Sequence, residues 1–191
     1  MGTLIAGLLL FLGLHSVRVF ADDWRTAMVG RMGLLPWKAS YALVSLIGFV
    51  LIVIGYGEAR QQAVVLWTPP LALRHLAMLL DLIAFVLVVA AYVPRNALKL
   101  KLKHPMVLGV KVWALAHLLS KGTLPAVLLF GAFLLWAIID FRSLRQRPVA
   151  PAFAVSANPL ATAVTVLLGL VAGFAFARWG HLALIGVAPL G

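Results

Sequence analysis

The chain of 191 residues is 64% hydrophobic and only 11% charged. A soluble domain of this size cannot bury so much apolar surface, so most of the chain must lie in lipid, and the class of soluble enzymes is excluded. The absence of cysteine excludes disulfides, thiolate metal ligands and a cysteine nucleophile. The net charge of +11 has to be explained by its distribution along the chain.

Six apolar stretches predict membrane-spanning helices. A helix needs roughly 20 apolar residues to cross the hydrocarbon layer of about 30 Å. The expected spans are 3–20, 39–56, 71–93, 106–119, 124–141 and 160–177, the fourth being the shortest. Their unbroken apolar runs lack the two-residue alternation of barrel strands. The sequence therefore predicts an all-α, polytopic membrane protein, with about six transmembrane helices in one bundle and a single domain over residues 1–191.

No cation precedes the apolar core of the first span, so we expect that span to be a retained anchor rather than a signal peptide.

Two connecting segments differ in composition from the other loops. Residues 22–37 mix apolar and basic side chains, which is typical either of a short amphipathic helix at the membrane surface or of an irregular loop. Residues 147–159 are rich in proline and small residues, which predicts a flexible linker before the last span.

The basic residues are strongly biased to one side of the predicted topology. Three alternate loops carry eleven of the sixteen lysine and arginine side chains: Arg18, Arg25, Arg31, Lys38, Arg95, Lys99, Lys101, Lys103, Arg142, Arg145 and Arg147. The positive-inside rule places these loops in the cytoplasm and both termini on the outer side. The charge then orients the chain and meets anionic lipid, so we expect no nucleic-acid partner.

Ionisable residues within the spans are the candidates for function, because each costs on the order of 2.5 to 3.5 kcal/mol to insert. Asp81 and Lys111 both fall near mid-membrane, at similar depths on different helices. We expect them to form a buried ion pair. The pair either fixes the register of the two helices or holds a polar group of a cofactor.

Two histidines lie on different apolar helices. His15 and His117 either bond carbonyls of their own helices or project into the bundle as the two imidazoles that six-coordinate haem iron requires. At 1.5 Å per residue the two histidines are offset by about 10 Å along the bundle, so a shared iron requires the helices to tilt or shift.

A third histidine opens the fourth predicted span. His104 precedes Pro105, the residue favoured at a first helical position, and follows three lysines. This corner is either a helix start beside lipid headgroups or a cationic pocket for a carboxylate or phosphate.

Several of these residues belong to motifs of a known family. The segments HSVR at 15–18, HPMVLGVKVWALAHLL at 104–119 and LFGAFLLWA at 129–137 closely resemble the NnrU family over nearly the whole chain. The resemblance implies a bacterial inner-membrane protein linked to nitrite and nitric oxide reduction in denitrification. A plant and cyanobacterial relative, the 15-cis-zeta-carotene isomerase, is a haem b enzyme, and its haem-ligating histidines correspond to His15 and His117.

A more distant resemblance links residues 103–109 (KHPMVLG) to isoprenylcysteine carboxyl methyltransferases, which bind S-adenosylmethionine. Lysine replaces the arginine of that motif and Val107 its tyrosine. The acidic and aromatic residues that follow in those enzymes are also missing after Arg147. The milder implication is an anion-binding corner at His104.

These observations lead to one main hypothesis. We expect a haem b protein with His15 and His117 as the iron ligands. Its expected role is in nitrogen-oxide metabolism or redox sensing, with haem chemistry that resembles that of the isomerase as one alternative. Arg18 and His104 are expected to neutralise the haem propionates, and Trp113 joins Asp81 and Lys111 among the expected cofactor-binding residues. The alternatives are a methyltransferase-like enzyme and a non-catalytic assembly or regulatory protein for a membrane partner. The expected ligand or substrate is a hydrophobic or nitrogen-oxide small molecule, which the sequence does not identify further.

Overall fold

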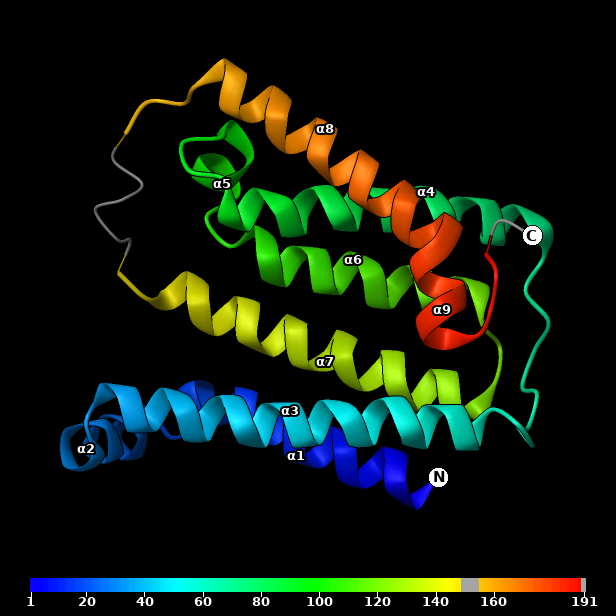
Figure 1. Ribbon diagram of the computed structural model, residues 1–191, viewed down its shortest axis with the longest axis horizontal. Helices are drawn as coiled ribbons and strands as arrows, with labels where there is room; N and C mark the ends of the chain where they lie inside the picture. Colours follow the sequence, from blue (N-terminus) through cyan, green and yellow to red (C-terminus); the bar gives the residue numbers. More distant parts are fainter. Residues whose placement is uncertain (149–154, 190–191) are drawn as a thin grey trace.

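The computed structural model describes residues 1–148 and 155–189, and these residues are largely helical (Figure 1). In chain order the elements are α1 (Gly2–Phe20), α2 (Asp22–Met32), α3 (Leu34–Ala59), α4 (Leu71–Tyr92), α5 (Ala97–Leu102), α6 (Pro105–Ser120), α7 (Leu124–Gln146), α8 (Pro159–Ala175), the π-helical turn η2 (Phe176–Gly180) and α9 (His181–Ile185). An isolated antiparallel bridge between Val65 and Thr123 ties the α3–α4 loop to the start of α7.

The predicted bundle of about six apolar helices is confirmed. Five helices are long and apolar enough to cross a membrane: α1, α3, α4, α7 and the continuous segment Pro159–Ile185. The sixth, α6, has 16 residues and is therefore about 24 Å long, short of the roughly 30 Å hydrocarbon thickness. Residues 22–32, for which the sequence left a helix and a loop open, form the helix α2.

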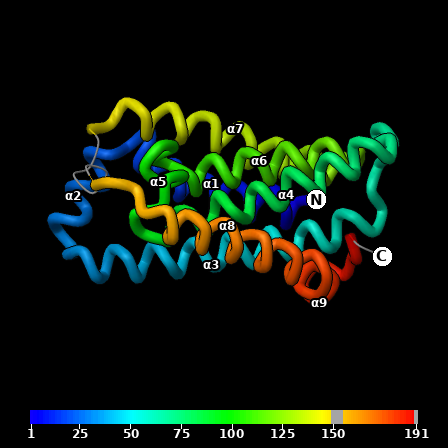
Figure 2. Tube along the Cα trace, turned by 90° about the horizontal axis from the view of Figure 1, so that it is seen from above, coloured from blue at the N-terminus to red at the C-terminus, as the bar shows by residue number. Residues whose placement is uncertain are grey.

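The long helices lie along one common axis, and the chain reverses its direction from one long helix to the next (Figures 1 and 2). α1 and α3 pack against each other at one side, α7 contacts α1, α6 lies beside α7, and α4 packs between α6 and α8. α2 and α5 lie at one end of the bundle and both termini lie toward the other (Figure 1). The basic loops that contain α2 and α5 therefore share one end, as their charge predicts.

Glycines allow α1 and α3 to approach closely. A Cβ at Gly7 would lie 2.6 Å from the backbone nitrogen of Ile52, and one at Gly48 would lie 2.9 Å from that of Phe11. Since membrane helices associate by close van der Waals packing at small residues, these glycines set the α1–α3 contact. That contact matters because α1 carries His15.

The fully buried Asn96 organises the turn between α4 and α6. Its side-chain nitrogen donates to the carbonyls of Ala90 and Val93 at 2.9 and 2.6 Å, and its oxygen caps α5 by accepting from the Lys99 nitrogen at 2.8 Å. Of the flexible linker predicted at 147–159, residues 149–154 lie outside the described residues.

Candidate functional site

An aromatic cluster fills the junction of α1, α3, α6 and α7. Buried aliphatic side chains from these four helices pack with a smaller set of aromatic rings, namely Phe11, Tyr56, Trp113, Phe130 and Phe133. Both candidate haem ligands border this cluster, His15 from α1 and His117 from α6. The bundle thus brings the two histidines to one aromatic region, although they come from helices that the chain separates by about a hundred residues.

His15 lies among three aromatic side chains from three helices. Its ring stacks on Phe11 with centroids 4.2 Å apart, and it meets Tyr41 of α3 and Trp136 of α7 edge-on at 5.3 and 6.1 Å. Phe11 is the residue that α3 approaches through Gly48. The glycine contact between α1 and α3 therefore also positions the ring on which His15 rests.

His117 has a similar environment nearer the opposite end of the bundle. Its ring stacks on Phe130 of α7 at 4.4 Å and lies 5.3 Å from Trp113, one turn earlier in α6. The side chain is only 15% exposed. Aromatic rings thus surround both imidazoles, and an imidazole in its neutral form can bind a metal.

Both imidazoles are held in the same way. The Nδ1 atom of His15 donates to the carbonyl of Phe11 at 2.7 Å, and Nδ1 of His117 donates to that of Trp113 at 2.9 Å. Because a carbonyl only accepts, the proton is assigned to Nδ1 in each ring, which leaves the Nε2 lone pair free. Metal-binding histidines are commonly fixed by such a bond, so this donor set fits a bis-imidazole haem iron.

A continuous series of rings separates the two histidines. Phe11 contacts Phe133 at 5.8 Å, and Phe133 contacts Trp113 at 5.4 Å. On α7 the neighbours of His15 and His117 are Trp136 and Phe130, six residues or about 9 Å apart along the axis. This agrees with the offset of about 10 Å expected from the sequence. Two ligands of one iron must therefore close part of that offset, which requires α1 and α6 to shift along α7.

The expected ion pair between Asp81 and Lys111 does not form. Asp81 Oδ1 lies 3.5 Å from Nδ1 of His117, whereas Lys111 Nζ lies 4.9 Å from the centre of the Phe141 ring on α7. Gly109 is the α6 residue that faces α4, and Lys111 follows it by about 200° around the helix. Lys111 thus points away from α4, because equal depth in the membrane does not guarantee the same helix face.

The other two expected anion-binding residues come from different helices, Arg18 from the last turn of α1 and His104 from the N-terminal cap of α6. Arg18 is 57% exposed on its side chain and lies 3.9 Å from Asp22, while its backbone carbonyl accepts from Arg147 at 2.9 Å. His104 meets Phe141 edge-on at 6.4 Å. Burial lowers the pKa of His104, and this effect exceeds the opposing effect of the Asp140 carboxylate. His104 therefore favours its neutral form in this position.

Three aromatic residues of α7 lie near the candidate histidines but were not predicted from the sequence to do so. Phe130, Phe133 and Trp136 recur every third residue and so share one face of the helix, which the spacing alone could have indicated. The indole nitrogen of Trp136 is buried and, within the described residues, has no hydrogen-bond partner. The contact between Tyr41 and His15 left no comparable signal, because it depends on tertiary packing.

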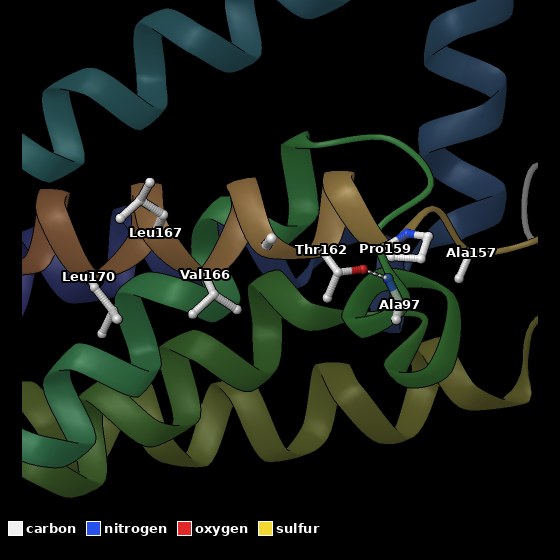
Figure 3. Close-up of a pocket in the computed structure, with 8 residues that line it drawn as sticks. Ala97, Ala157, Pro159, Thr162, Val166, Leu167 and Leu170 are labelled. Carbon is white, nitrogen blue, oxygen red and sulfur yellow. Dashed lines mark hydrogen bonds between the residues drawn. The ribbon is translucent and has the colours of Figure 1, made fainter.

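Neither of two hollows on the surface is lined by a histidine side chain. The larger is open and apolar, between the first turns of α8 and the start of α5, where Thr162 accepts a hydrogen bond from the Ala97 nitrogen (Figure 3). A second lies between α1 and α7 and includes Ser16 and Trp136. Within the described ranges, no group of three or more His, Cys, Asp or Glu side chains could hold a bare metal ion.

These features define a polytopic α-helical membrane protein with two imidazoles, each hydrogen-bonded to its own helix, beside an aromatic core. The sequence model of the NnrU protein family matches residues 3–189, and the chain belongs to that family. No curated protein matches the chain, and no solved structure matches it.

Proposed function

We propose that this protein binds one haem b within the membrane, with Nε2 of His15 and Nε2 of His117 as the axial ligands. The proposal rests on a hydrogen bond that both rings make. Each imidazole donates Nδ1–H to the carbonyl four residues earlier, which leaves its Nε2 free. The resemblance of their motifs to a haem b enzyme supports the same assignment. When bound, the haem supplies a one-electron redox centre.

The remaining residues have simple roles in this proposal. The aromatic side chains of α6 and α7 exclude water and offer flat apolar faces to a macrocycle; Trp113 contacts both His117 and Phe133. Arg18 and Lys111 supply positive charge toward the basic end of the bundle, and neutral His104 supplies a hydrogen-bond donor there; such groups stabilise the carboxylates of a cofactor. Asp81 acts on His117 rather than on Lys111.

A titration of the purified, cofactor-free protein with haemin in detergent tests the proposal. We expect saturable binding of one haem per chain, with the absorption spectrum of a low-spin iron that changes reversibly on reduction and reoxidation. Binding that does not saturate, or that equals binding to empty micelles, would contradict the proposal. A bound haem that cannot be reduced would contradict a redox role.

We also propose a bacterial inner-membrane location with the three basic loops in the cytoplasm and both termini in the periplasm. The excess of basic residues on alternate loops supports this orientation. Because the chain has no cysteine, single cysteines introduced at the exposed Asp23 and Gln61 can be labelled specifically. In intact spheroplasts, a membrane-impermeant maleimide should label Gln61→Cys strongly and Asp23→Cys only after permeabilisation. The reverse pattern would invert the topology.

The link to nitrite and nitric oxide metabolism, or to redox sensing, extends this proposal through the family resemblance. A haem held by His15 and His117 would suit electron transfer and sensing, because a small molecule such as nitric oxide would have to compete with a histidine for the iron. A membrane protein that supplies or accepts the electron is the corresponding partner.

A further inference from the structure

One carboxylate, on the partly buried side chain of Asp81, lies beside a candidate haem ligand. Asp81 is on the buried stripe of α4, four residues after Ala77 and three before Ala84, both of which are only 3% exposed. Its Oδ1 atom is buried and, among the described residues, has no hydrogen-bond partner. Because ionisable groups are costly within a bilayer, this position indicates a function that an apolar side chain would not perform.

The carboxylate approaches His117 at the ring nitrogen that does not bind iron in the proposed site. Asp81 Oδ1 lies 3.5 Å from Nδ1, and the same nitrogen donates to the Trp113 carbonyl at 2.9 Å. The distance from Asp81 to His117 exceeds that of a normal N–H···O hydrogen bond, so the Trp113 carbonyl is the main acceptor. Asp81 is a second polar group close to the same N–H. Nε2 stays free on the other side of the ring.

The two histidines differ in this respect. His15 has the same carbonyl bond through Nδ1, but no carboxylate lies within 4.0 Å of it in the part of the chain that the structure describes. Its neighbours Phe11, Tyr41 and Trp136 are aromatic. The asymmetry is therefore one of direct contact: Asp81 of α4, which packs on α6, approaches His117 closely, whereas Asp140 of α7 interacts with His15 only from beyond 4.0 Å.

We infer that Asp81 is a positioning residue that fixes the His117 ring and increases the electron donation of its Nε2 to the iron, so that the two axial ligands are unequal. This inference rests on the proposed function. Carboxylates behind metal-bound imidazoles orient the ring and raise its basicity. A more basic ligand stabilises ferric over ferrous iron, so Asp81 lowers the midpoint potential of the haem.

The test compares wild type with Asp81→Asn, which keeps the size of the side chain and removes its carboxylate. Glu58→Gln is the matched control, because Glu58 is exposed at the end of α3, where it accepts from Thr3 at 3.0 Å. We expect Asp81→Asn to bind ferric haem about 10- to 100-fold more weakly and to shift the midpoint potential to more positive values. Glu58→Gln should match wild type in both measurements.

Each outcome of this experiment decides a separate point. A purely structural role for Asp81 would lower the yield of folded protein and leave the midpoint potential of the haem-bound fraction unchanged, which would overturn the inference. Asp81→Ser is a second variant with the same expected shift, so the result does not depend on the folding of one protein. If wild type itself binds no haem, the proposed function fails. If wild type binds haem and both variants keep its potential, only the role of Asp81 fails.

Discussion

Replacing either His15 or His117 with alanine is expected to abolish the low-spin haem spectrum and to weaken haem binding by more than about a hundredfold, beyond the 10- to 100-fold typical of outer-shell residues. Each variant leaves the iron with one protein ligand. The fold should survive, because the hydrogen bond of each ring goes to its own helix. Absorption spectra and haemin titrations of the purified variants measure the effect.

The exposed His75 near the start of α4 provides the control for these variants. His75→Ala should bind haem as wild type does. The double variant His15→Ala/His117→Ala should be little worse than either single variant in its spectrum, because the loss of one ligand already removes six-coordinate iron. A normal low-spin spectrum in either single variant would show that the corresponding histidine is not a ligand.

Replacing Gly55 with alanine is expected to destabilise the protein by about 1 to 3 kcal/mol, the usual cost of forcing extra volume into a packed contact. The added Cβ would overlap the backbone nitrogen of Leu4 and lie 2.6 Å from its Cα, so α1 would have to move away from α3. The midpoint of unfolding in detergent, followed by circular dichroism, measures the change. Because α1 also carries His15, haem binding should weaken in the same variant.

Gly57 lies two residues further along α3 and is the matched control. A Cβ there would meet no atom within 4 Å, so Gly57→Ala should be neutral, or stabilising by up to about 1 kcal/mol through helix propensity. Equal effects of the two substitutions would show that the close approach of α1 and α3 does not contribute to stability.

Apolar runs predicted the spans because lipid requires every backbone polar group to be bonded within its own segment. The predicted segment 71–93 corresponds to α4 (Leu71–Tyr92) almost residue for residue. The predicted segment 39–56 is shorter than α3 (Leu34–Ala59), because the helix continues beyond its apolar part into residues such as Lys38 and Glu58. Hydropathy therefore located the spans, but it did not locate the ends of helices that extend into the interface.

The positions of the two histidines along the bundle were predictable from the sequence, and the pairing of the charged residues was not. The depth of His15 and His117 along their helices gave the offset that the structure shows, because depth follows directly from the rise per residue. Pairing Asp81 with Lys111 required the rotation of α6 about its axis as well. That rotation is set by the close approach of Gly109 to α4, a tertiary contact that hydropathy does not encode.

The electron paramagnetic resonance spectrum of the ferric protein, recorded at low temperature after loading with one haem per chain, tests the central claim most directly. Two axial imidazoles from His15 and His117 predict a low-spin signal in wild type and a high-spin signal in each single alanine variant that retains haem. A high-spin signal in fully loaded wild type, or a low-spin signal that persists in His117→Ala, would contradict ligation by these two histidines.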